Sequence, residues 1–367
     1  MTHVLISGAG VAGSALAYWL HRNGMTATVV ERAPAIRPGG LPVDFRGSAI
    51  TVLDRMGILD ELRSHTTRTG DMTVVDAAGA PLWTMQGEVF TGDLEVPKDD
   101  LARVLYELTA PFTEYVFADS VRAVTERSDD VLVEFDRGEP RVVDLVVGAD
   151  GVHSAVRKLV FDPHGQSVQS LGIWFTTFAL PNYLGLDYTG VAHIADDRSA
   201  NVIASRHNTQ ARAMFVFPAP LGSRPPRDVA SWQPILRDAF AGVGWEVPRL
   251  LAEFAEGTEV YADEMAQVLL PAWSWGRTVL IGDAGYCASP MSGRGTSQAI
   301  IGAYVLAGEL ASRDDHAAAF DAYEQRLRGY ARTNQRLAWQ SVRLGRPADG
   351  ALDDVPIPDY ATDLTVL

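Results

Sequence analysis

The clearest hydrophobic pattern lies at the start of the chain. Residues 3–7 form an apolar run, which a glycine-rich turn, Gly8-Ala9-Gly10-Val11-Ala12-Gly13, separates from apolar side chains at three- and four-residue spacing. This pattern predicts a strand and then a helix, which ends at Asn23-Gly24. A second apolar strand over residues 27–30 ends at Glu31. A strand, this glycine spacing, a helix, a strand and an acidic residue about 20 positions further on together predict a dinucleotide-binding unit.

In such a unit the glycines and the acidic residue have separate tasks. The glycines allow a tight turn, close approach of the backbone to a pyrophosphate, and close packing of the helix on the strand. The positive end of the helix faces the phosphates, and Glu31 is placed to accept hydrogen bonds from ribose hydroxyls. The glycine motif alone is unspecific, but its flanking elements favour dinucleotide binding over a purely structural turn.

A second strand with a glycine-rich turn lies near residue 283. An apolar strand over residues 278–281 ends in Gly282-Asp283, and Gly293 and Gly295 open a helix with apolar residues at three- and four-residue spacing. The glycines allow the backbone to approach a flat or anionic ligand, and a carboxylate at the end of a buried strand can accept from a sugar-alcohol hydroxyl. This stretch alone also fits a structural interpretation, in which Asp283 caps a turn and the glycines shape a loop.

A third apolar strand, residues 145–148, ends in Ala149-Asp150-Gly151 and precedes a helix for which Ser154 is the expected cap. An ordinary strand-to-helix turn is the alternative at this position, because Asp and Gly are common turn residues. Residues 34–46 are rich in Pro and Gly and predict an ordered loop, and Ser48 is the expected cap of the short helix that follows.

From residue 166 to residue 217 the pattern changes to β-rich segments with many aromatic side chains. This region predicts a sheet that covers a substrate. The remaining patterns predict a hairpin, a helix from Lys98, two helices between the sheet and residue 277, and a long last helix. The hairpin comprises residues 72–76 and 81–85, and the helix from Lys98 comprises residues 98–108. The two later helices comprise residues 231–240 and 247–254, and the last helix residues 319–337.

Composition narrows the class of protein. The 367 residues are 47% hydrophobic, which supports a large core and suggests one nucleotide-binding domain with a second domain inserted into it. The formal net charge of −15 argues against nucleic acid as a partner, because duplex binding uses a basic face. The single cysteine can form no intrachain disulfide, so we expect a reducing, cytoplasmic setting.

Two further absences are expected from the sequence. No apolar run approaches the roughly 20 residues of a membrane span, so we expect no membrane-spanning segment. The eight histidines do not pair with other ligands at metal-binding spacing, so we expect no metal.

The strand and turn units together resemble one known family. A glycine motif near the start, an Asp-Gly turn at Asp150-Gly151 and a Gly-Asp pair at Gly282-Asp283 are similar to the FAD-dependent aromatic hydroxylases. These are the group A flavoprotein monooxygenases with the p-hydroxybenzoate hydroxylase fold. Among the subgroups the chain most resembles tetracycline-inactivating and polyketide-tailoring monooxygenases, because it is short and we expect no thioredoxin-like domain at its C-terminal end.

The resemblance implies an α/β fold. A Rossmann-like FAD-binding domain would be interleaved with a β-sheet substrate domain and followed by a long C-terminal helix. The FAD-binding domain would comprise residues 1–70, 97–165 and 271–312. The substrate-binding domain would comprise residues 71–96 and 166–270, with a C-terminal helix over 313–350 and a tail over 351–367.

The resemblance also implies which residues hold FAD. Gly8, Gly10 and Gly13 would hold the pyrophosphate, Glu31 the adenosine ribose, and Asp283 the ribityl chain or pyrophosphate. Asp150 would serve both FAD and the passing nicotinamide nucleotide. The other residues implied at the cofactor are Val11, Ala12, Arg32, Arg46, Lys98, Arg103 and Thr296, with Pro290, Gly293 and Gly295 around the isoalloxazine.

The chain departs from the family pattern at three positions. After Gly-Asp the usual Ala-Ala-His is Ala284-Gly285-Tyr286, and a common Asn two residues beyond the last glycine is Ser297. Lys98 stands where an arginine is usual, and Arg103 could supply that contact instead. These changes leave FAD binding expected but do not carry over the detailed hydrogen bonding of the active site.

For the substrate the sequence suggests Phe178, Arg206, Met214 and Pro290. Arg206 could steer an enolate or phenolate oxygen, with a solvated surface charge as the simpler alternative. Trp273-Ser-Trp275 is similar to the tryptophan pair of flavin-dependent halogenases, but its position predicts packing beneath the sheet. Cys287 is expected to be a small buried residue rather than a covalent flavin link.

The family chemistry implies a monooxygenase. NADPH or NADH would dock transiently and reduce FAD, and molecular oxygen would then supply one atom to a polycyclic phenolic or enolic small molecule, such as a polyketide or tetracycline-like compound. No side chain is singled out as catalytic, and the subunit would be a monomer or a homodimer. A flavin-dependent reductase or dehydrogenase without oxygen transfer, and a non-enzymatic escort protein on the same fold, are the alternatives.

Overall fold

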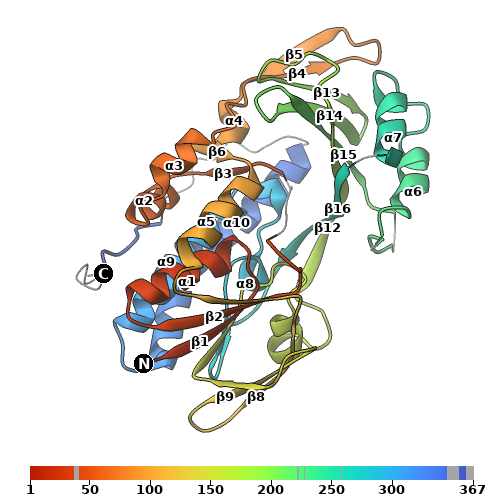
Figure 1. Cartoon of the computed structure of the whole chain (residues 1–367). Coiled ribbons are helices and arrows are strands. Elements are labelled where there is room, and N and C mark those ends of the chain that lie inside the picture. Colours follow the sequence, from red (N-terminus) through yellow and green to blue (C-terminus); the bar gives the residue numbers. More distant parts are fainter. Residues whose placement is uncertain (37–40, 221–222, 227, 257, 345–354, 361–367) are drawn as a thin grey trace.

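The computed structural model (Figure 1) describes residues 1–36, 41–220, 223–226, 228–256, 258–344 and 355–360. A six-stranded sheet carries the first domain in the order β17-β18-β11-β1-β2-β7. Its strands are β1 (His3–Ser7), β2 (Thr26–Glu31), β7 (Glu114–Phe117), β11 (Leu145–Gly148), β17 (Ser274–Trp275) and β18 (Thr278–Leu280). All neighbouring strands except β17 and β18 run parallel. The carboxyl ends of β1, β11 and β18 therefore meet at one edge, where the glycine turn, Asp150 and Asp283 follow them.

Helices pack against one another beside this sheet and form the larger core. The two central ones, α1 (Val11–Arg22) and α9 (Gly295–Ala311), contact each other, and α9 is buried from Ser297 to Glu309. A helix that is apolar on all sides belongs in the middle of a core, which explains this position of α9. Around them lie α2 (Ser48–Arg55), α3 (Leu59–Ser64), α5 (Lys98–Thr109) and α10 (His316–Leu344).

A small antiparallel sheet packs against the same main sheet through a second core cluster. It contains β8 (Val121–Glu126), β9 (Val131–Phe135) and β10 (Arg141–Val143). Every second residue of β9 is buried, and these side chains share the cluster with Leu5 and Leu280 of the main sheet. This period of two is the pattern of a strand with one buried face.

The second domain is built on a seven-stranded sheet in the order β16-β12-β15-β14-β13-β4-β5. Its strands are β4 (Met72–Val75), β5 (Pro81–Met85), β12 (Val168–Pro181), β13 (Gly190–Ala195), β14 (Arg198–Ser205), β15 (Gln210–Pro218) and β16 (Thr258–Val268). Two helices, α6 (Trp232–Ala239) and α7 (Val247–Glu256), lie beside this sheet (Figure 1). Aromatic side chains of β12 and β15 form a core cluster with residues of both helices.

Short elements complete the fold. A two-stranded sheet pairs β3 (Val43–Phe45) with β6 (Leu94–Val96). The single turns are α4 (Glu88–Thr91), the π-helix η1 (Arg157–Phe161), α8 (Asp283–Tyr286) and the 3-10 helix η2 (Pro290–Ser292). Of these, α8 and η2 lie between β18 and α9, in the second glycine-rich stretch.

Most elements expected from the sequence are confirmed, including the α/β fold class and the long last helix. Ser154 caps its helix, because its Oγ accepts the backbone N–H of Arg157 at 2.9 Å. The cap assigned to Ser48 is wrong: Gly47 precedes the helix, and the Ser48 hydroxyl donates to the Val355 carbonyl at 2.6 Å. Residues 43–45 form a strand where a loop was expected.

The strand β16 is not predicted by the sequence pattern. Its polar residues Asp263, Glu264 and Gln267 obscure the alternation expected of a strand. In the described parts of the chain, no helix has both the length and the apolar character needed to cross a membrane. The expectations for residues 37–40, 345–350 and most of the tail lie outside the described residues.

Candidate active site

The first glycine-rich turn joins β1 to α1 with little room for side chains. A Cβ atom on Gly8, where φ is +112°, would lie 2.5 Å from the Ala149 carbonyl oxygen, and a Cβ on Gly13 would lie 2.0 Å from the Gly8 carbonyl oxygen. A Cβ on Gly10, by contrast, would meet nothing within 4 Å. Gly8 and Gly13 therefore permit close packing of the turn, whereas Gly10 leaves the start of α1 open to a ligand.

The start of α1 is a suitable place for a phosphate. Gly10 is the N-cap residue of α1 and has no side chain that could accept a capping hydrogen bond. Val11 and Ala12 follow it in the first turn. The unpaired amides of such a turn, with the positive end of the helix dipole, attract anions. Glu31 lies beside this turn, because its carboxylate accepts from the Ala9 N–H at 3.1 Å and from the Ala33 N–H at 2.8 Å. The next residue, Arg32, is exposed.

Asp283 lies where two helix starts converge. Gly282 has φ of +60°, and a Cβ there would lie 3.2 Å from the Ala12 Cβ, so β18 ends against the first turn of α1. A Cβ on Gly295 would lie 3.8 Å from Asp283 Oδ1, so the carboxylate also adjoins the first turn of α9, which contains Thr296. The Asp283 side chain is exposed and can therefore be reached by a bound group.

The charges around Asp283 come from three segments. The surrounding protein raises the pKa of Asp283 above its ordinary value by desolvation, while the positive charges of Lys98 and Arg157 oppose that shift. Cys287 is buried next to the same carboxylate, and burial raises the pKa of its thiol well above the ordinary value. A neutral, buried thiol fits the expected packing role of Cys287.

Asp150 has a local structural task in addition to any contact with a ligand. Its Oδ2 accepts from the backbone N–H groups of Ala155 at 2.7 Å and Val156 at 3.2 Å, so it caps the helical segment after the Asp-Gly turn. Arg157, which the sequence reasoning did not single out, is fully buried and donates to the Ala284 carbonyl at 2.9 Å. Burial lowers the pKa of Arg157, and the carboxylates of Asp150 and Asp162 oppose that shift. Arg157 thus ties the Asp-Gly turn to α8.

Arg46 lies against the start of α9. Its backbone N–H donates to Ser297 Oγ at 3.3 Å, and its Nε is 2.9 Å from Asp44 Oδ2. Burial raises the pKa of Asp44, against the opposing charges of Arg46 and Arg294. Gly293 adopts the left-handed conformation with φ of +59° and follows the short η2 helix, whose first residue, Pro290, is exposed. These contacts place Arg46 beside the turn of Pro290, Gly293 and Gly295.

Lys98 and Arg103, the two cations predicted to reach the cofactor from α5, have different surroundings. Arg103 is bound to carboxylates of its own helix, 3.7 Å from Asp100 and 3.1 Å from Glu107. Lys98 is the residue whose charge acts on Asp283. Lys98 is exposed at the start of α5, whereas Arg103 is engaged by carboxylates of its own helix.

The two faces of the seven-stranded sheet separate the predicted substrate residues. Phe178 is fully buried and packs against Phe215 and Phe254, in the core beneath α6 and α7. It cannot contact a substrate from there, so its assignment as a substrate residue is corrected. Met214 pairs directly with Thr177 and lies on the opposite face, because its neighbours Ala213 and Phe215 point into the helix-covered core.

The strand β16 contributes to this second face. Tyr261 of β16 pairs with Thr177, and its hydroxyl donates to Asp263 Oδ2 at 3.2 Å. Partial desolvation by the surrounding protein raises the pKa of Tyr261, and the nearby charges of Asp263 and Asp283 raise it further. His153, which follows the Asp-Gly turn, also contacts Asp263 at 3.1 Å. The contact between His153 and Asp263 links β16 to the Asp-Gly turn. The place of Tyr261 on this face follows from the pairing of β16 with β12, which the sequence pattern does not show.

Three remaining expectations concern the tryptophans and metal binding. Trp273 is buried, with its ring centroid 4.3 Å from that of Tyr286, as expected for packing. Trp275 is 70% exposed, so the expectation that both tryptophans pack beneath the sheet is wrong for this residue. Among the described residues, no group of three or more His, Cys, Asp or Glu side chains is placed to hold a metal ion.

The arrangement fits the parts of an FAD molecule. The open position beside Gly10 and the amides of α1 suit the pyrophosphate, and Glu31 lies next to them for the adenosine ribose. The exposed Asp283 carboxylate suits a hydroxyl of the ribityl chain. The left-handed Gly293 and the start of α9 allow a flat ring to approach the backbone.

Comparison with known proteins agrees with this fit. The FAD binding domain family matches residues 1–344. A flavin-dependent monooxygenase of Legionella longbeachae is 36% identical over 92% of this chain and 88% of its own length. FAD-dependent monooxygenase asL4 of Sarocladium schorii is 31% identical over 84% of this chain and 75% of its own length. The crystal structure of tetracycline destructase Tet(55) superimposes with a TM-score of 0.88 at 34% identity, covering 97% of this chain and 98% of that chain.

The family match spans almost the whole chain, and the relatives confirm the resemblance drawn from the three sequence motifs. FAD is the cofactor, and NAD(P)H is the usual reductant in this family. The chain belongs to the FAD-binding family of flavin-dependent monooxygenases.

Proposed function

We propose that this enzyme uses NADPH or NADH and molecular oxygen to hydroxylate or otherwise oxygenate a polycyclic phenolic or enolic small molecule, such as a polyketide or a tetracycline-like compound. The likeness to tetracycline destructase Tet(55), at 34% identity over nearly the full length of both chains, supports this substrate class. The observation that carries the proposal is the chemistry of the sheet face opposite α6 and α7.

That face presents four different side chains side by side. Tyr261, Thr177, Met214 and Asn201 are direct partners on the adjacent strands β16, β12, β15 and β14. Four strands span about 14 Å at the usual strand spacing, which is wide enough for a flat skeleton of several fused rings. Met214 is half-buried and offers a soft apolar contact through its thioether, and the exposed Tyr261 offers a phenolic hydrogen bond to an oxygen substituent, whereas Thr177 and Asn201 are buried within the face.

The same face meets the turn that precedes α9. Phe175, two residues before Thr177, belongs to a core cluster against which Met291 and Val216 pack. Met291 lies in η2 next to Pro290, so the sheet face is in contact with the segment assigned to the isoalloxazine. A substrate on this face would therefore lie between the sheet and the flavin.

Arg212 supplies a positive charge on this face. It lies two positions before Met214 on β15, so both side chains are on the same side of the strand. A guanidinium stabilises an enolate or phenolate oxygen by a charge-assisted hydrogen bond. Arg212 replaces Arg206 in the proposed substrate site, because Arg206 is bound to Asp99 outside the sheet.

When bound, FAD supplies the redox and oxygen-transfer chemistry. The residues of the chain orient the cofactor and the substrate, and they exclude water from the reacting atoms. The α1 and α9 starts and Asp283 hold the cofactor, while the residues of β12, β14 and β15 hold the substrate carbon close to the reacting atoms. Packing of the sheet on η2 would exclude water from the space between the substrate and the flavin.

The test is oxygen uptake by the purified yellow protein with NADPH, with and without a panel of phenolic polyketides and tetracyclines, while hydrogen peroxide is monitored. We expect at least one such compound to accelerate oxygen uptake with little peroxide. If NADPH reduces the flavin and every compound yields only peroxide, the proposed substrate class is wrong. Named monooxygenase relatives favour oxygen transfer over the reductase and escort alternatives.

We also propose a cytoplasmic enzyme that is a monomer or a homodimer. The single cysteine supports a reducing compartment, since no intrachain disulfide can form. Light scattering during gel filtration distinguishes the two oligomeric states, and a larger assembly would contradict the proposal.

A further inference from the structure

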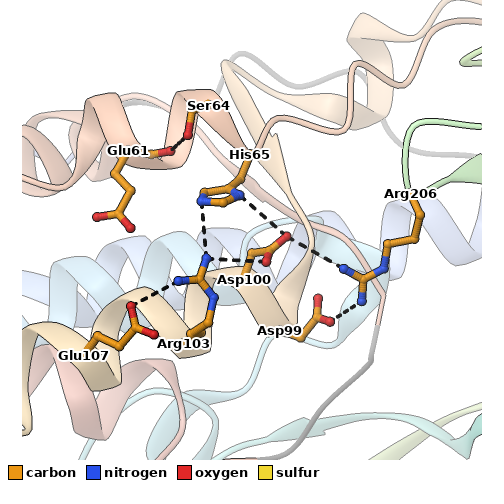
Figure 2. Close-up of polar contacts among 8 residues, drawn as sticks. All are labelled: Glu61, Ser64, His65, Asp99, Asp100, Arg103, Glu107 and Arg206. Carbon is orange, nitrogen blue, oxygen red and sulfur yellow. Dashed lines mark hydrogen bonds and ion pairs between the residues drawn. The ribbon is translucent and has the colours of Figure 1, made fainter.

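A cluster of charged side chains joins the two domains through the start of α5 (Figure 2). Arg206, in the hairpin between β14 and β15, forms an ion pair with Asp99 and lies 3.9 Å from Asp100. Asp100 also lies 3.7 Å from Arg103 and 3.9 Å from His65. Arg206 and Asp99 are 107 positions apart, so the pair connects the substrate sheet to the FAD-binding domain.

The hairpin that carries Arg206 is held in an unusual conformation. Arg206, His207 and Asn208 have φ of 50°, 53° and 66°, in the left-handed region that residues other than Gly, Asn and Asp rarely adopt. The connection between β12 and β13 fixes this geometry: Asn208 Oδ1 accepts the Tyr188 N–H at 2.8 Å, and Asn182 Nδ2 donates to the Asn208 carbonyl at 2.9 Å. Backbone strain persists where surrounding contacts determine it, and these hydrogen bonds hold the hairpin from which Arg206 reaches Asp99 of α5.

The other end of the contact is next to the cofactor residues. Asp99 and Asp100 lie in the first turn of α5 and directly follow Lys98, whose charge acts on Asp283. The Arg206 side chain is 41% exposed and that of Asp99 is 21% exposed. An exposed ion pair contributes only about 0 to 1 kcal/mol to stability, so the contact matters for geometry more than for folding.

We propose that Arg206 is a positioning residue that clamps the β14–β15 hairpin to α5 and thereby sets how the substrate face of the sheet lies over the flavin. This inference rests on the proposed function, because that face is the proposed substrate site. β14 and β15 carry Asn201 and Met214 of this face, so movement of their hairpin changes the position of the substrate. Displacement of a reacting carbon by about 1 Å is enough to lower a rate substantially.

Without the contact between Arg206 and Asp99, more of the electrons of NAD(P)H should end in hydrogen peroxide and fewer in oxygenated product and water. In the coupled reaction, substrate, oxygen, NAD(P)H and one proton give the oxygenated product, water and NAD(P)+. With the substrate carbon misplaced, oxygen, NAD(P)H and one proton give hydrogen peroxide and NAD(P)+, and the substrate is unchanged. The ratio of oxygenated product to NAD(P)H consumed therefore measures how well the contact between Arg206 and Asp99 keeps the substrate in position.

The test compares Arg206→Gln, Arg206→Lys, Asp99→Asn and the double variant Arg206→Gln with Asp99→Asn, all with FAD bound. Arg122→Gln is the matched control, because Arg122 forms an exposed ion pair with Glu134 at 3.1 Å within the small β8–β9 sheet. Two readouts are used: amide hydrogen exchange of residues 205–210 and 98–102, and the ratio of product to NADPH consumed. Thermal melting checks that each variant is folded.

We expect Arg206→Gln and Asp99→Asn to raise exchange in both segments and to lower the coupling ratio about fivefold, the fold-change that corresponds to loss of about 1 kcal/mol. The double variant should be no worse than Arg206→Gln alone, because that substitution already removes the pairs of Arg206 with both Asp99 and Asp100. Arg206→Lys should restore part of the coupling, and Arg122→Gln should behave as wild type.

Unchanged exchange in Arg206→Gln would overturn the clamp whatever the substrate. Loss of coupling in Arg206→Gln but not in Asp99→Asn would also overturn it, since Arg206 would then act on the substrate itself. If exchange rises in both segments but no compound in the panel is oxygenated by the wild type, the clamp stands and the proposed substrate class fails.

Discussion

The cofactor turns and the substrate sheet use their residues in opposite ways. At the proposed cofactor turns the backbone would contact the ligand, and glycines allow this backbone to pack closely: a Cβ on Gly13 would lie 2.0 Å from a carbonyl oxygen. In the substrate sheet the side chains are the functional part, and two faces of the same strands differ. Phe178 and Phe215 fill a closed core under two helices, whereas Met214 and Asn201 lie on the other face. Function in the first region depends on conformation, and in the second on which side of a strand a residue lies.

The largest expected effect comes from the packing glycine of the first turn. Gly13→Ala should destabilise the protein by about 3 kcal/mol or more, because the new methyl group meets backbone that cannot move aside. Gly10→Ala is the matched control: it should melt as wild type, since nothing lies within 4 Å of its Cβ, but should bind FAD about tenfold more weakly. Melting curves and flavin absorbance measure both, and a Gly13→Ala protein of wild-type stability would contradict the packing role.

The two sheet faces should respond differently to truncation. Phe178→Ala should cost about 3 to 5 kcal/mol of stability, as expected for a fully buried aromatic side chain, with little change in substrate KM for the folded fraction. Met214→Ala should lose less stability and lower kcat/KM about tenfold through KM. Chemical denaturation and steady-state kinetics test this contrast. If Phe178→Ala and Met214→Ala changed the substrate KM equally, the helix-covered face would also contribute to substrate binding.

Replacement of the exposed carboxylate separates cofactor binding from stability. Asp283→Asn should weaken FAD binding about 10- to 100-fold, since it removes a charged acceptor. Because the surroundings raise the pKa of Asp283, ionising this carboxyl costs more free energy in the folded protein without FAD than in the unfolded chain. This cost is absent below the unfolded pKa of about 4 and is present once the pH rises through the folded pKa.

The FAD-free Asp283→Asn protein should therefore melt at or slightly above the wild-type temperature at neutral pH, with the difference vanishing near pH 4. The effect is modest, because the side chain is exposed. Melting of FAD-free protein across this pH range and titration with FAD provide the two measurements. Full flavin retention by Asp283→Asn would remove Asp283 from the cofactor site.

The smallest expected effect is at Tyr261. Tyr261→Phe removes a hydroxyl that donates to Asp263 at 3.2 Å, from a side chain that is 47% exposed. Stability should change by less than about 0.5 kcal/mol, while kcat/KM for the substrate should fall about fivefold. Trp275→Phe, at a 70% exposed position on β17, should change neither quantity. Unchanged kinetics in Tyr261→Phe would place the edge strand β16 outside the substrate site.

The sequence alone predicts the cofactor region well because its demands are local. Gly8, Gly10 and Gly13 stand within one turn, and the strand before and the helix after them can be read from hydrophobic spacing. The close approaches of Gly8 and Gly13 and the positive φ of Gly8 are the physical reasons for those glycines. Asp283 is predicted from the same kind of local pattern, as a carboxylate that follows a buried strand.

The substrate region could not be predicted to the same depth. Period-two alternation shows that a strand has two faces, but only the positions of α6 and α7 decide that Phe178 is covered and Met214 is not. The charged residues of β16 hid a strand and with it Tyr261. Arg206 finds its partner 107 positions away, and no local pattern reports such a contact.

The most direct test of the central claim is mass spectrometry of the product formed under oxygen-18 gas with NADPH and a polycyclic phenolic or enolic compound that accelerates oxygen uptake. The account predicts a product that contains one oxygen-18 atom, formed in nearly equal amount to the NADPH consumed. A product without oxygen-18, or recovery of the oxygen as hydrogen peroxide with every compound tested, would contradict it.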